Sequence, residues 1–274
     1  MGGQPATIPV ARKWLTWPRQ RWIGMTIGFG TQILFLYTVW QLLSFLKPGP
    51  RVEQESSQIG NLLLSLQFCI VHSWLLFPST RRWLTQYLAS EFYGCLFCVA
   101  TCLGLLAMFV GWQTSPIIIW NLVGPAAIVL ETGFYAAWIG LFYSLALTGL
   151  GYQTGWTPFW FWLRRQPIPK RTFEPRGAYL VLRHPVYLSF LGLIWFTPRM
   201  TLDHAVLTSA WTMYILIGSY LKDERLAFYY GREYRRYQER VSGYPLIGWG
   251  PLGRRQPDSQ AESVPIAAMK KTAG

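Results

Sequence analysis

Between Trp22 and Leu46 the chain reads WIGMTIGFGTQILFLYTVWQLLSFL, 25 consecutive residues that include no Asp, Glu, Lys, Arg or His. A helix that crosses a bilayer needs about 20 such residues. Three further runs have a similar length: residues 59–77 with one His, residues 92–112, and residues 123–149 with one acid. Each of the four runs is long enough to predict a membrane-spanning helix without support from its neighbours.

Two shorter apolar runs follow, at residues 186–198 and 205–221, with a brief polar break between them. Their lengths of 13 and 17 residues favour a tilted or partly re-entrant hairpin. The composition agrees with a membrane setting, because 14% of the residues are charged against about 25% in soluble domains. We therefore predict an all-α integral membrane protein, a multi-pass helical bundle of five to six membrane segments with a C-terminal interfacial helix.

The chain is strongly basic, with a net charge of +13 at pH 7, and such an excess suits either nucleic acid or an anionic membrane surface. With six segments, 22 of the 25 Lys and Arg residues fall on one side, and Lys47, Arg51 and Arg199 fall on the other. Cytoplasmic loops of membrane proteins carry this excess. The sequence predicts that both termini are cytoplasmic and that the basic residues serve topology and lipid contact, with no nucleic acid as partner.

Polar chemistry gathers where the fifth apolar run begins, at Arg183-His184-Pro185-Val186-Tyr187. Proline is favoured in the first turn of a helix, so Arg183 and His184 are expected at or just before a helix N-terminus. Unpaired backbone N–H groups and two basic side chains at such a place suit an anionic group. The alternative is a positive anchor at the bilayer interface, flanked by tyrosines of the aromatic belt.

A second polar stretch follows the sixth run, from Lys222-Asp223-Glu224-Arg225 to Tyr237. Acidic side chains at a helix exit can hold the cationic or hydroxyl parts of a ligand, whereas the alternative is a solvated helix with i,i+4 ion pairs. Within the apolar runs, His72 is a candidate because ionisable groups inside a membrane are often functional. A neutral His72 that is hydrogen-bonded near a helix end is an equally good interpretation.

These residues form a recognisable pattern. Gly177-x-Tyr179-x-x-x-Arg183-His184-Pro185-x-Tyr187, a hairpin, an acidic pair, Gly231 and Tyr234-x-x-Tyr237 resemble the isoprenylcysteine carboxyl methyltransferase and phospholipid methyltransferase superfamily, over about residues 177–241. A narrower resemblance, to bacterial methanethiol S-methyltransferases, extends over about residues 59–241. It rests on the segments 67–73, 183–188, 195–198, 200–201, 204 and 214–218.

The resemblance implies S-adenosyl-L-methionine as methyl donor. Cys95, Cys98 and Cys102 share one face of the third long run and could bind a metal, but free cysteines are more often small buried apolar side chains, so we expect no metal. The same resemblance implies cofactor-binding roles for Tyr179, Arg183, His184, Pro185, Tyr187, Leu188, Asp223, Glu224, Tyr234 and Tyr237. The expected catalytic residues are Arg183, His184, Glu224 and His72. The sequence departs from the superfamily at Ser189, where a Gly is usual, and at the acidic pair, so both Asp223 and Glu224 stay open as the functional carboxylate.

The resemblance also suggests the reaction and the organisation of the chain. We expect methylation of a small thiol such as methanethiol to dimethyl sulfide, in a bacterial inner membrane, with His72, His204 or a tyrosine as proton acceptor. The alternatives are a lipid amine or a prenylcysteine carboxylate as acceptor, or a non-enzymatic membrane protein of the same fold. The expected regions are a basic N-terminus (1–21), membrane helices (22–149), a methyltransferase-like cofactor-binding region (150–253) and a disordered tail (254–274).

Overall fold

The computed structural model describes residues 19–47, 58–170 and 172–256. The chain divides into two compact units, one made of residues 1–172 and 186–218 and the other of residues 173–185 and 219–274. Most of the basic N-terminus (1–18) and most of the tail (257–274) lie outside the described residues. The expectations for those two segments therefore stay predictions.

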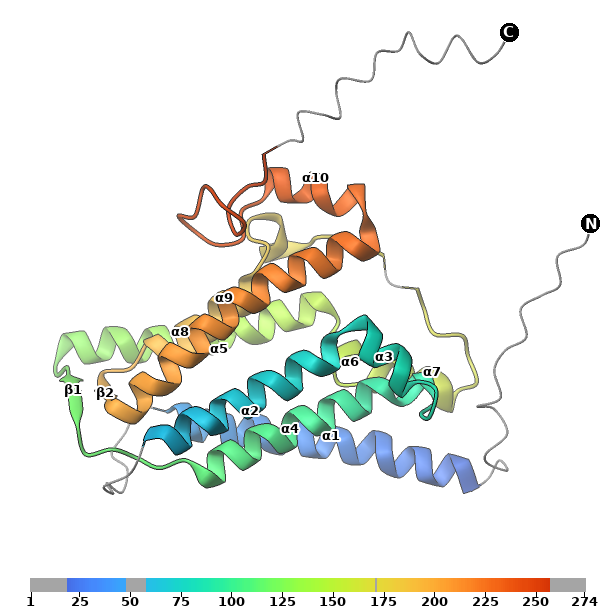
Figure 1. Cartoon of the computed structure of the whole chain (residues 1–274), viewed down its shortest axis with the longest axis horizontal. Helices are drawn as coiled ribbons and strands as arrows, with labels where there is room; N and C mark the ends of the chain where they lie inside the picture. Colours follow the sequence, from blue (N-terminus) through green and yellow to red (C-terminus); the bar gives the residue numbers. More distant parts are fainter. Residues whose placement is uncertain (1–18, 48–57, 171, 257–274) are drawn as a thin grey trace, which may run out of the picture. The chain divides into compact units, whose positions relative to one another are not determined.

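Four long helices of the first unit match the four long apolar runs (Figure 1). They are α1 (Arg19–Leu46), α2 (Gln58–Leu76), α4 (Tyr93–Gly111) and α5 (Pro125–Thr148). All four are long and apolar enough to cross a membrane, and α4 packs against both α1 and α2. The prediction of a helical membrane protein is confirmed.

The surface of these helices is apolar where a soluble protein would be polar. Ile33 and Trp40 on α1, Val110 on α4 and Ile139 on α5 each expose more than 60% of their surface. Polar side chains inside α1 satisfy themselves locally, since the hydroxyl of Thr38 donates to the carbonyl of Leu34 at 2.8 Å. Such a surface fits contact with lipid rather than water.

The hairpin after residue 185 consists of a short helix and a long one. Helix α8 (Pro185–Trp195) has 11 residues, whereas α9 (Leu202–Tyr230) has 29 and does not end near Leu221 as the apolar run suggested. The acidic stretch therefore lies inside α9 and not at a helix exit. The residues after Leu221 have good helix propensity, and α9 ends where Gly231 adopts a φ of 55°. Neither helix meets the length and composition of the four spans, so six membrane segments stay a prediction.

The all-α expectation missed a small antiparallel sheet in the first unit. Strand β1 (Ile118–Asn121) pairs with β2 (Arg199–Thr201), with Trp120 opposite Met200. Just after β2, the carboxylate of Asp203 accepts hydrogen bonds from the backbone N–H of Ser115 (3.0 Å) and the indole of Trp112 (3.1 Å). A buried carboxylate in the first turn of α9 thereby fixes the connection between α4 and the sheet.

Short helices fill the remaining turns of the first unit: α3 (Pro78–Leu84), η2 (Ser90–Phe92), α6 (Leu150–Gln153) and α7 (Trp156–Leu163). Gly149 caps α5 in the left-handed region (φ 75°), which confirms the expected helix end there. Gly94 and Gly155 approach so closely that a Cβ on Gly94 would lie 2.6 Å from the Cα of Gly155.

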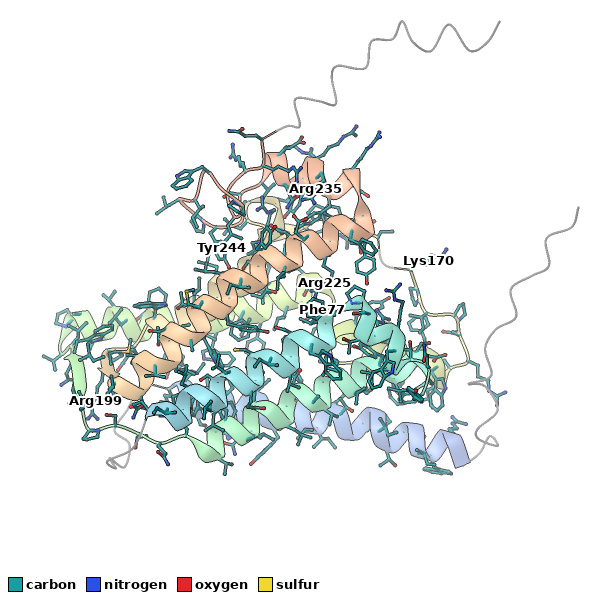
Figure 2. All side chains as sticks on the ribbon, in the orientation of Figure 1. Phe77, Lys170, Arg199, Arg225, Arg235 and Tyr244 are labelled. Carbon is teal, nitrogen blue, oxygen red and sulfur yellow. The ribbon has the colours of Figure 1, made fainter. Side chains whose placement is uncertain are left out.

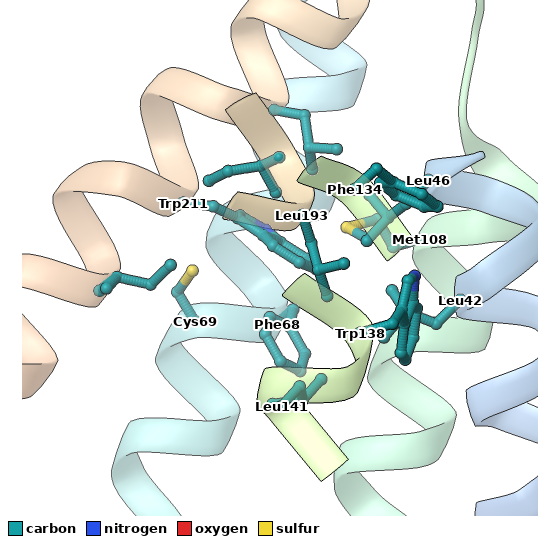
Figure 3. Close-up of a cluster of buried hydrophobic side chains, with 13 residues drawn as sticks. Leu42, Leu46, Phe68, Cys69, Met108, Phe134, Trp138, Leu141, Leu193 and Trp211 are labelled. Carbon is teal, nitrogen blue, oxygen red and sulfur yellow. The ribbon is translucent and has the colours of Figure 1, made fainter. Parts of the chain in front are cut away.

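The apolar core of the first unit joins α1, α2, α4, α5, α8 and α9 (Figure 3). Its buried side chains include Leu42, Phe68, Met108, Trp138 and Trp211. Cys69 lies in this core, and Cys95, Cys98 and Cys102 are also buried as free thiols. Buried free thiols of this kind pack as small apolar side chains.

The second unit is built on the end of α9, on α10 (Arg232–Arg240) and on the short helix η3 (Gly177–Leu180). Ala227, Tyr234 and Tyr237 form its apolar core, and the ring of Phe173 packs against both tyrosines. After α10 the chain returns alongside the segment before α8, where Leu182 and Ser242 form a parallel bridge.

Candidate active site

The second unit contains a buried charged cluster made of Arg183, His184 and Asp223. The Asp223 carboxylate oxygen Oδ2 lies 2.9 Å from Arg183 Nη2 and 3.2 Å from His184 Nε2. The three side chains expose at most 1% of their surface. Arg183 and His184 precede α8, and Asp223 lies on α9, so the structure brings together the two stretches that the sequence singled out.

Arg183 also holds the chain that follows α10. Its Nη1 donates to the backbone carbonyls of Val241 and Gly253, both at 2.9 Å, and to that of Gln238 at 3.3 Å. Nη2 donates to the carbonyl of Pro251 at 3.3 Å. A planar guanidinium with several donors suits such a set of acceptors better than an ammonium group. The Arg183 side chain therefore joins the chain after α10 to the charged cluster.

Burial and neighbouring charges shift the pKa values of His184 and Asp223. Burial lowers the pKa of His184 below its ordinary value, although the Asp223 carboxylate opposes this effect. Burial alone would raise the pKa of Asp223, but the contacts with His184, Arg183 and Tyr234 outweigh it and hold the pKa low. Both shifts favour an ionised Asp223 carboxylate beside the guanidinium and a neutral imidazole at His184.

Three tyrosines surround the cluster. The Tyr234 hydroxyl donates to Asp223 Oδ1, and the Tyr237 hydroxyl donates to the backbone carbonyl of Tyr179. Burial raises the pKa of both Tyr234 and Tyr237, so both phenols keep their protons. The ring of Tyr179 meets a cation, since the Lys222 ammonium lies 5.8 Å from its centroid.

Glu224, the other candidate carboxylate, points elsewhere. Its two oxygens accept from Nη1 and Nη2 of Arg235 at 2.9 and 2.7 Å, and its side chain is 43% exposed. The hydrogen bond from Arg235 holds the pKa of Glu224 below its ordinary value. Of the two acids that the sequence left open, Asp223 contacts Arg183 and His184, and Glu224 is the one that solvent reaches.

The sequence did not single out the segment 242–253, which completes the site. Its backbone accepts from the N–H groups of Arg183 and His184, through the carbonyls of Ser242 (2.9 Å) and Gly243 (3.2 Å). The ring of Tyr244 lies 5.5 Å from that of His184, and its hydroxyl bonds to that of Ser219 on α9. Figure 2 labels Tyr244 in this segment and Arg235 on α10.

Two glycines of this segment lie where a side chain would clash with the backbone. A Cβ on Gly243 would lie 2.4 Å from the carbonyl oxygen of Leu252 and 3.0 Å from the His184 ring, and a Cβ on Gly253 would lie 2.4 Å from the backbone nitrogen of Trp249. The signal in the sequence was the alternation of glycine with Tyr244 and Trp249 between residues 243 and 253. That signal is weak, because glycine and aromatic residues are common in loops.

The other expected site residues belong to the first unit or to the start of α8. Pro185 opens α8, and Tyr187 and Leu188 follow on that helix, where Tyr187 packs against the apolar core. His72 lies on α2, one turn before the helix ends, with Nδ1 3.2 Å from the hydroxyl of Thr101.

His204, a further candidate, has a structural partner in the first unit. Its Nε2 lies 2.9 Å from the carbonyl of Ile194 at the end of α8, and the hydroxyl of Thr208 donates to the same oxygen at 3.1 Å. A buried carbonyl at a helix end needs such donors. His204 therefore fixes the turn between α8 and α9.

Comparison with known proteins supplies the family. No family model and no solved structure matches the chain. A methanethiol S-methyltransferase of Pseudomonas deceptionensis is 30% identical over 215 residues, which cover 77% of this chain and 79% of the relative. Methanethiol S-methyltransferase 1 of Bradyrhizobium diazoefficiens is 28% identical over 245 residues (84% and 83%), and that of Mycobacterium tuberculosis is 27% identical over 240 residues (84% and 98%). With a match of this extent, and with the two halves of its sequence pattern joined in one buried cluster, the chain belongs to the methanethiol S-methyltransferase family.

Proposed function

We propose that the chain is a membrane methyltransferase that transfers a methyl group from S-adenosyl-L-methionine to methanethiol and releases dimethyl sulfide. The observation that carries this proposal is the similarity, over most of the chain, to several proteins named for that reaction. The four apolar helices support a membrane setting, into which a small apolar thiol partitions.

The residues of the second unit fit the proposed donor, which carries a sulfonium, an ammonium and a carboxylate. Aromatic faces and carboxylates attract such cations, and Tyr179 already holds the Lys222 ammonium against its ring. Glu224 is a solvent-accessible carboxylate next to the buried cluster. We assign donor binding to the expected set, Tyr179, Arg183, His184, Pro185, Tyr187, Leu188, Asp223, Glu224, Tyr234 and Tyr237.

Within this set the residues differ in what they do. Arg183, His184 and Asp223 hold the surrounding backbone in place, because their polar atoms are directed at one another and at backbone carbonyls. Tyr179 and Glu224 reach solvent and are suited to direct contact with the donor. When bound, the donor supplies an electrophilic methyl group on a positively charged sulfur, so the task of the protein is alignment of the thiol and removal of its proton.

We further propose that both termini and the second unit face the cytoplasm, where the donor is available. Of the described basic residues, Arg81, Arg82, Arg164 and Arg165 follow α2 and α7, and α10 carries several more. The excess of Lys and Arg on this side supports the orientation. The orientation can be tested with single cysteines introduced at Ser79 and Pro116 and labelled from outside intact cells. We expect position 116 to be labelled, and labelling of position 79 alone would reverse the topology.

The function can be tested by measuring dimethyl sulfide in the headspace of cells that express the chain and are fed methanethiol. We expect dimethyl sulfide above the level of cells that carry the empty vector. If no dimethyl sulfide forms while lipid extracts take up labelled methyl groups, the acceptor is a lipid and the proposal is wrong about the substrate.

The test of the donor site is the affinity for S-adenosylhomocysteine, the demethylated donor. His184→Ala removes a ring that contacts both Asp223 and Tyr244, and we expect binding to be lost while the helical content is retained. Trp249→Ala is the matched control, because Trp249 is an aromatic residue of the same unit that is 85% exposed. Unchanged affinity in His184→Ala would refute the site assignment.

A further inference from the structure

An exposed aromatic row continues one of the membrane helices of the first unit. We define the Trp83 ladder as Trp74 on α2, Trp83 on α3 and Tyr87 in the turn after α3. Ring centroids lie 6.4 Å apart for Trp74 and Trp83, and 5.9 Å apart for Trp83 and Tyr87. The three residues are 48%, 50% and 78% exposed. A contiguous row of exposed rings is a surface that a partner of matching chemistry would cover.

The Trp83 ladder begins where α2 ends. This helix has 19 residues, so it is about 28 Å long, close to the ~30 Å of the hydrocarbon core of a bilayer. Ile70, one turn before Trp74, is 65% exposed, as expected where lipid surrounds the helix. The chain then turns at Phe77, which Figure 2 labels, and Pro78 opens α3. Because tryptophan and tyrosine are enriched at the boundary between the bilayer and water, the Trp83 ladder lies at the level of the lipid head groups.

Two arginines next to the Trp83 ladder carry positive charge that no described carboxylate balances. Arg81 and Arg82 are exposed in the last turn of α3, and the Arg81 guanidinium lies 5.4 Å from the centroid of the Tyr93 ring. In residues 19–47, 58–170 and 172–256, neither guanidinium forms an ion pair. The sequence from 56 to 90 includes no Asp or Glu. A guanidinium binds phosphate with two parallel hydrogen bonds, so this surface suits a phosphate group that is attached to apolar chains.

We propose that the Trp83 ladder and the two arginines form a binding site for an anionic phospholipid. Its phosphate pairs with Arg81 and Arg82, and its acyl chains lie against the Trp74 ring and the exposed face of α2. A zwitterionic lipid fits less well, because the two guanidinium groups repel its ammonium. Free phosphate would meet the arginines but would leave the rings exposed, so the phosphate of a lipid is the better occupant. This inference goes beyond the proposed function, since it concerns a lipid that is neither methyl donor nor methyl acceptor.

Competition between two lipids tests the site in the purified protein. Delipidated protein in neutral detergent receives phosphatidylglycerol and phosphatidylcholine with the same acyl chains, and native mass spectrometry measures the affinity for the first bound molecule of each. We expect wild type to prefer phosphatidylglycerol and Arg82→Gln to lower that affinity about fivefold, the ordinary contribution of one basic residue at an anionic surface. The double variant Arg81→Gln/Arg82→Gln should lower it about 25-fold and leave the affinity for phosphatidylcholine unchanged.

Arg176→Gln is the matched control. It removes the same charge from another exposed guanidinium, one that already pairs with Glu174, and should change the affinity for phosphatidylglycerol less than about twofold. Equal losses in Arg82→Gln and Arg176→Gln, or no loss in the double variant, would refute the site. A further arm needs no variant: higher ionic strength should weaken the preference of wild type for phosphatidylglycerol, and a preference that salt does not change would refute the pairing with phosphate.

A photoreactive phosphatidylglycerol locates the lipid and separates it from free phosphate. With a diazirine on an acyl chain, we expect crosslinks between Ile70 and Trp83 that disappear in the double variant, and crosslinks confined to other helices would overturn the placement. Trp83→Ala should lower the affinity for phosphatidylglycerol at least about threefold, since it removes apolar surface that the lipid buries. Trp249→Ala, which changes an exposed tryptophan of the second unit, should not lower it. Loss of the crosslinks on addition of inorganic phosphate would indicate an anion site without a lipid and would overturn the inference.

Discussion

Replacement of Asp223 by asparagine should strongly destabilise the second unit. The change keeps the shape of the side chain and removes its charge. Arg183, whose side chain is fully buried, then keeps a positive charge with no acidic partner within 4 Å among the described residues. Removal of one member of a buried ion pair costs about 3–5 kcal/mol, because the remaining charge is neither paired nor hydrated.

Other contacts of the two side chains shift this cost in both directions. The carbonyls of Val241 and Gly253, 2.9 Å from the guanidinium, compensate part of its charge and place the cost toward the lower end. The loss of charge-assisted contacts from His184 and Tyr234 to the carboxylate moves it upward again. A loss of about 3 kcal/mol corresponds to a more than 100-fold increase in the open population of the unit, at about 1.4 kcal/mol per factor of ten.

Trypsin reports that population directly, because α10 carries Arg232, Arg235, Arg236 and Arg240, and α10 must open before it can be cleaved. When opening is fast relative to cleavage, the cleavage rate follows the open population. Asp223→Asn in detergent should be cleaved within α10 about 100-fold faster than wild type. The control is Glu224→Gln, which breaks a partly exposed ion pair worth about 0–1 kcal/mol and should change the rate less than about fivefold. Similar rates for the two variants would refute the conclusion that Asp223 stabilises the unit.

Three further predictions follow from named contacts. Burial and the positive charges of Lys222 and Arg183 lower the pKa of His184, although the Asp223 carboxylate opposes this effect. Below about pH 6.5 the unfolded chain therefore binds a proton at this residue that the folded chain does not. Resistance of the second unit to trypsin should therefore be complete above that pH and should fall as the pH drops below it, and His184→Gln should flatten this slope; a slope that persists would assign it to another group. Gly243→Ala places a Cβ 2.4 Å from the Leu252 carbonyl and should accelerate cleavage within α10 about 5- to 100-fold, the equivalent of about 1–3 kcal/mol of overpacking, whereas Gly248→Ala, with nothing within 4 Å, should have little effect. His204→Ala removes the ring that contacts the Ile194 carbonyl and should lower the thermal midpoint in detergent by the equivalent of about 1–3 kcal/mol; an unchanged midpoint would contradict its role in fixing the turn between α8 and α9.

The membrane helices could be predicted from the sequence because length and hydropathy determine them. The runs 22–46, 59–77, 92–112 and 123–149 match α1, α2, α4 and α5 to within a few residues. The end of α9 could not be predicted in the same way. Its apolar pattern stops near Leu221, but helix propensity continues to Tyr230, so a boundary taken from hydropathy falls too early.

The early boundary also explains why Asp223 and Glu224 could not be separated. Adjacent residues of a helix point about 100° apart, so a continuous α9 directs the two carboxylates to different partners. Asp223 contacts Arg183, and Glu224 contacts Arg235. A helix that ended before both residues would have left either of them able to contact Arg183.

The contacts of the Arg183 guanidinium could not be predicted from the sequence for a different reason. A basic residue before a helix N-terminus suggests an anion site, and the resemblance pointed the same way. In the structure its guanidinium contacts the Asp223 carboxylate and backbone carbonyls of residues 238–253, the latter at sequence separations of 55 to 70. Nothing in the composition of that segment indicates which of its carbonyls will converge on one guanidinium, because every residue carries the same group.

The central claim is that this chain moves a methyl group from S-adenosyl-L-methionine to methanethiol. Purified protein in lipid nanodiscs, given donor with a CD₃ group and unlabelled methanethiol, tests it most directly. We predict dimethyl sulfide that carries the CD₃ group, formed in a one-to-one ratio with S-adenosylhomocysteine and absent with His184→Ala. Unlabelled dimethyl sulfide, or S-adenosylhomocysteine without any dimethyl sulfide, would contradict the claim.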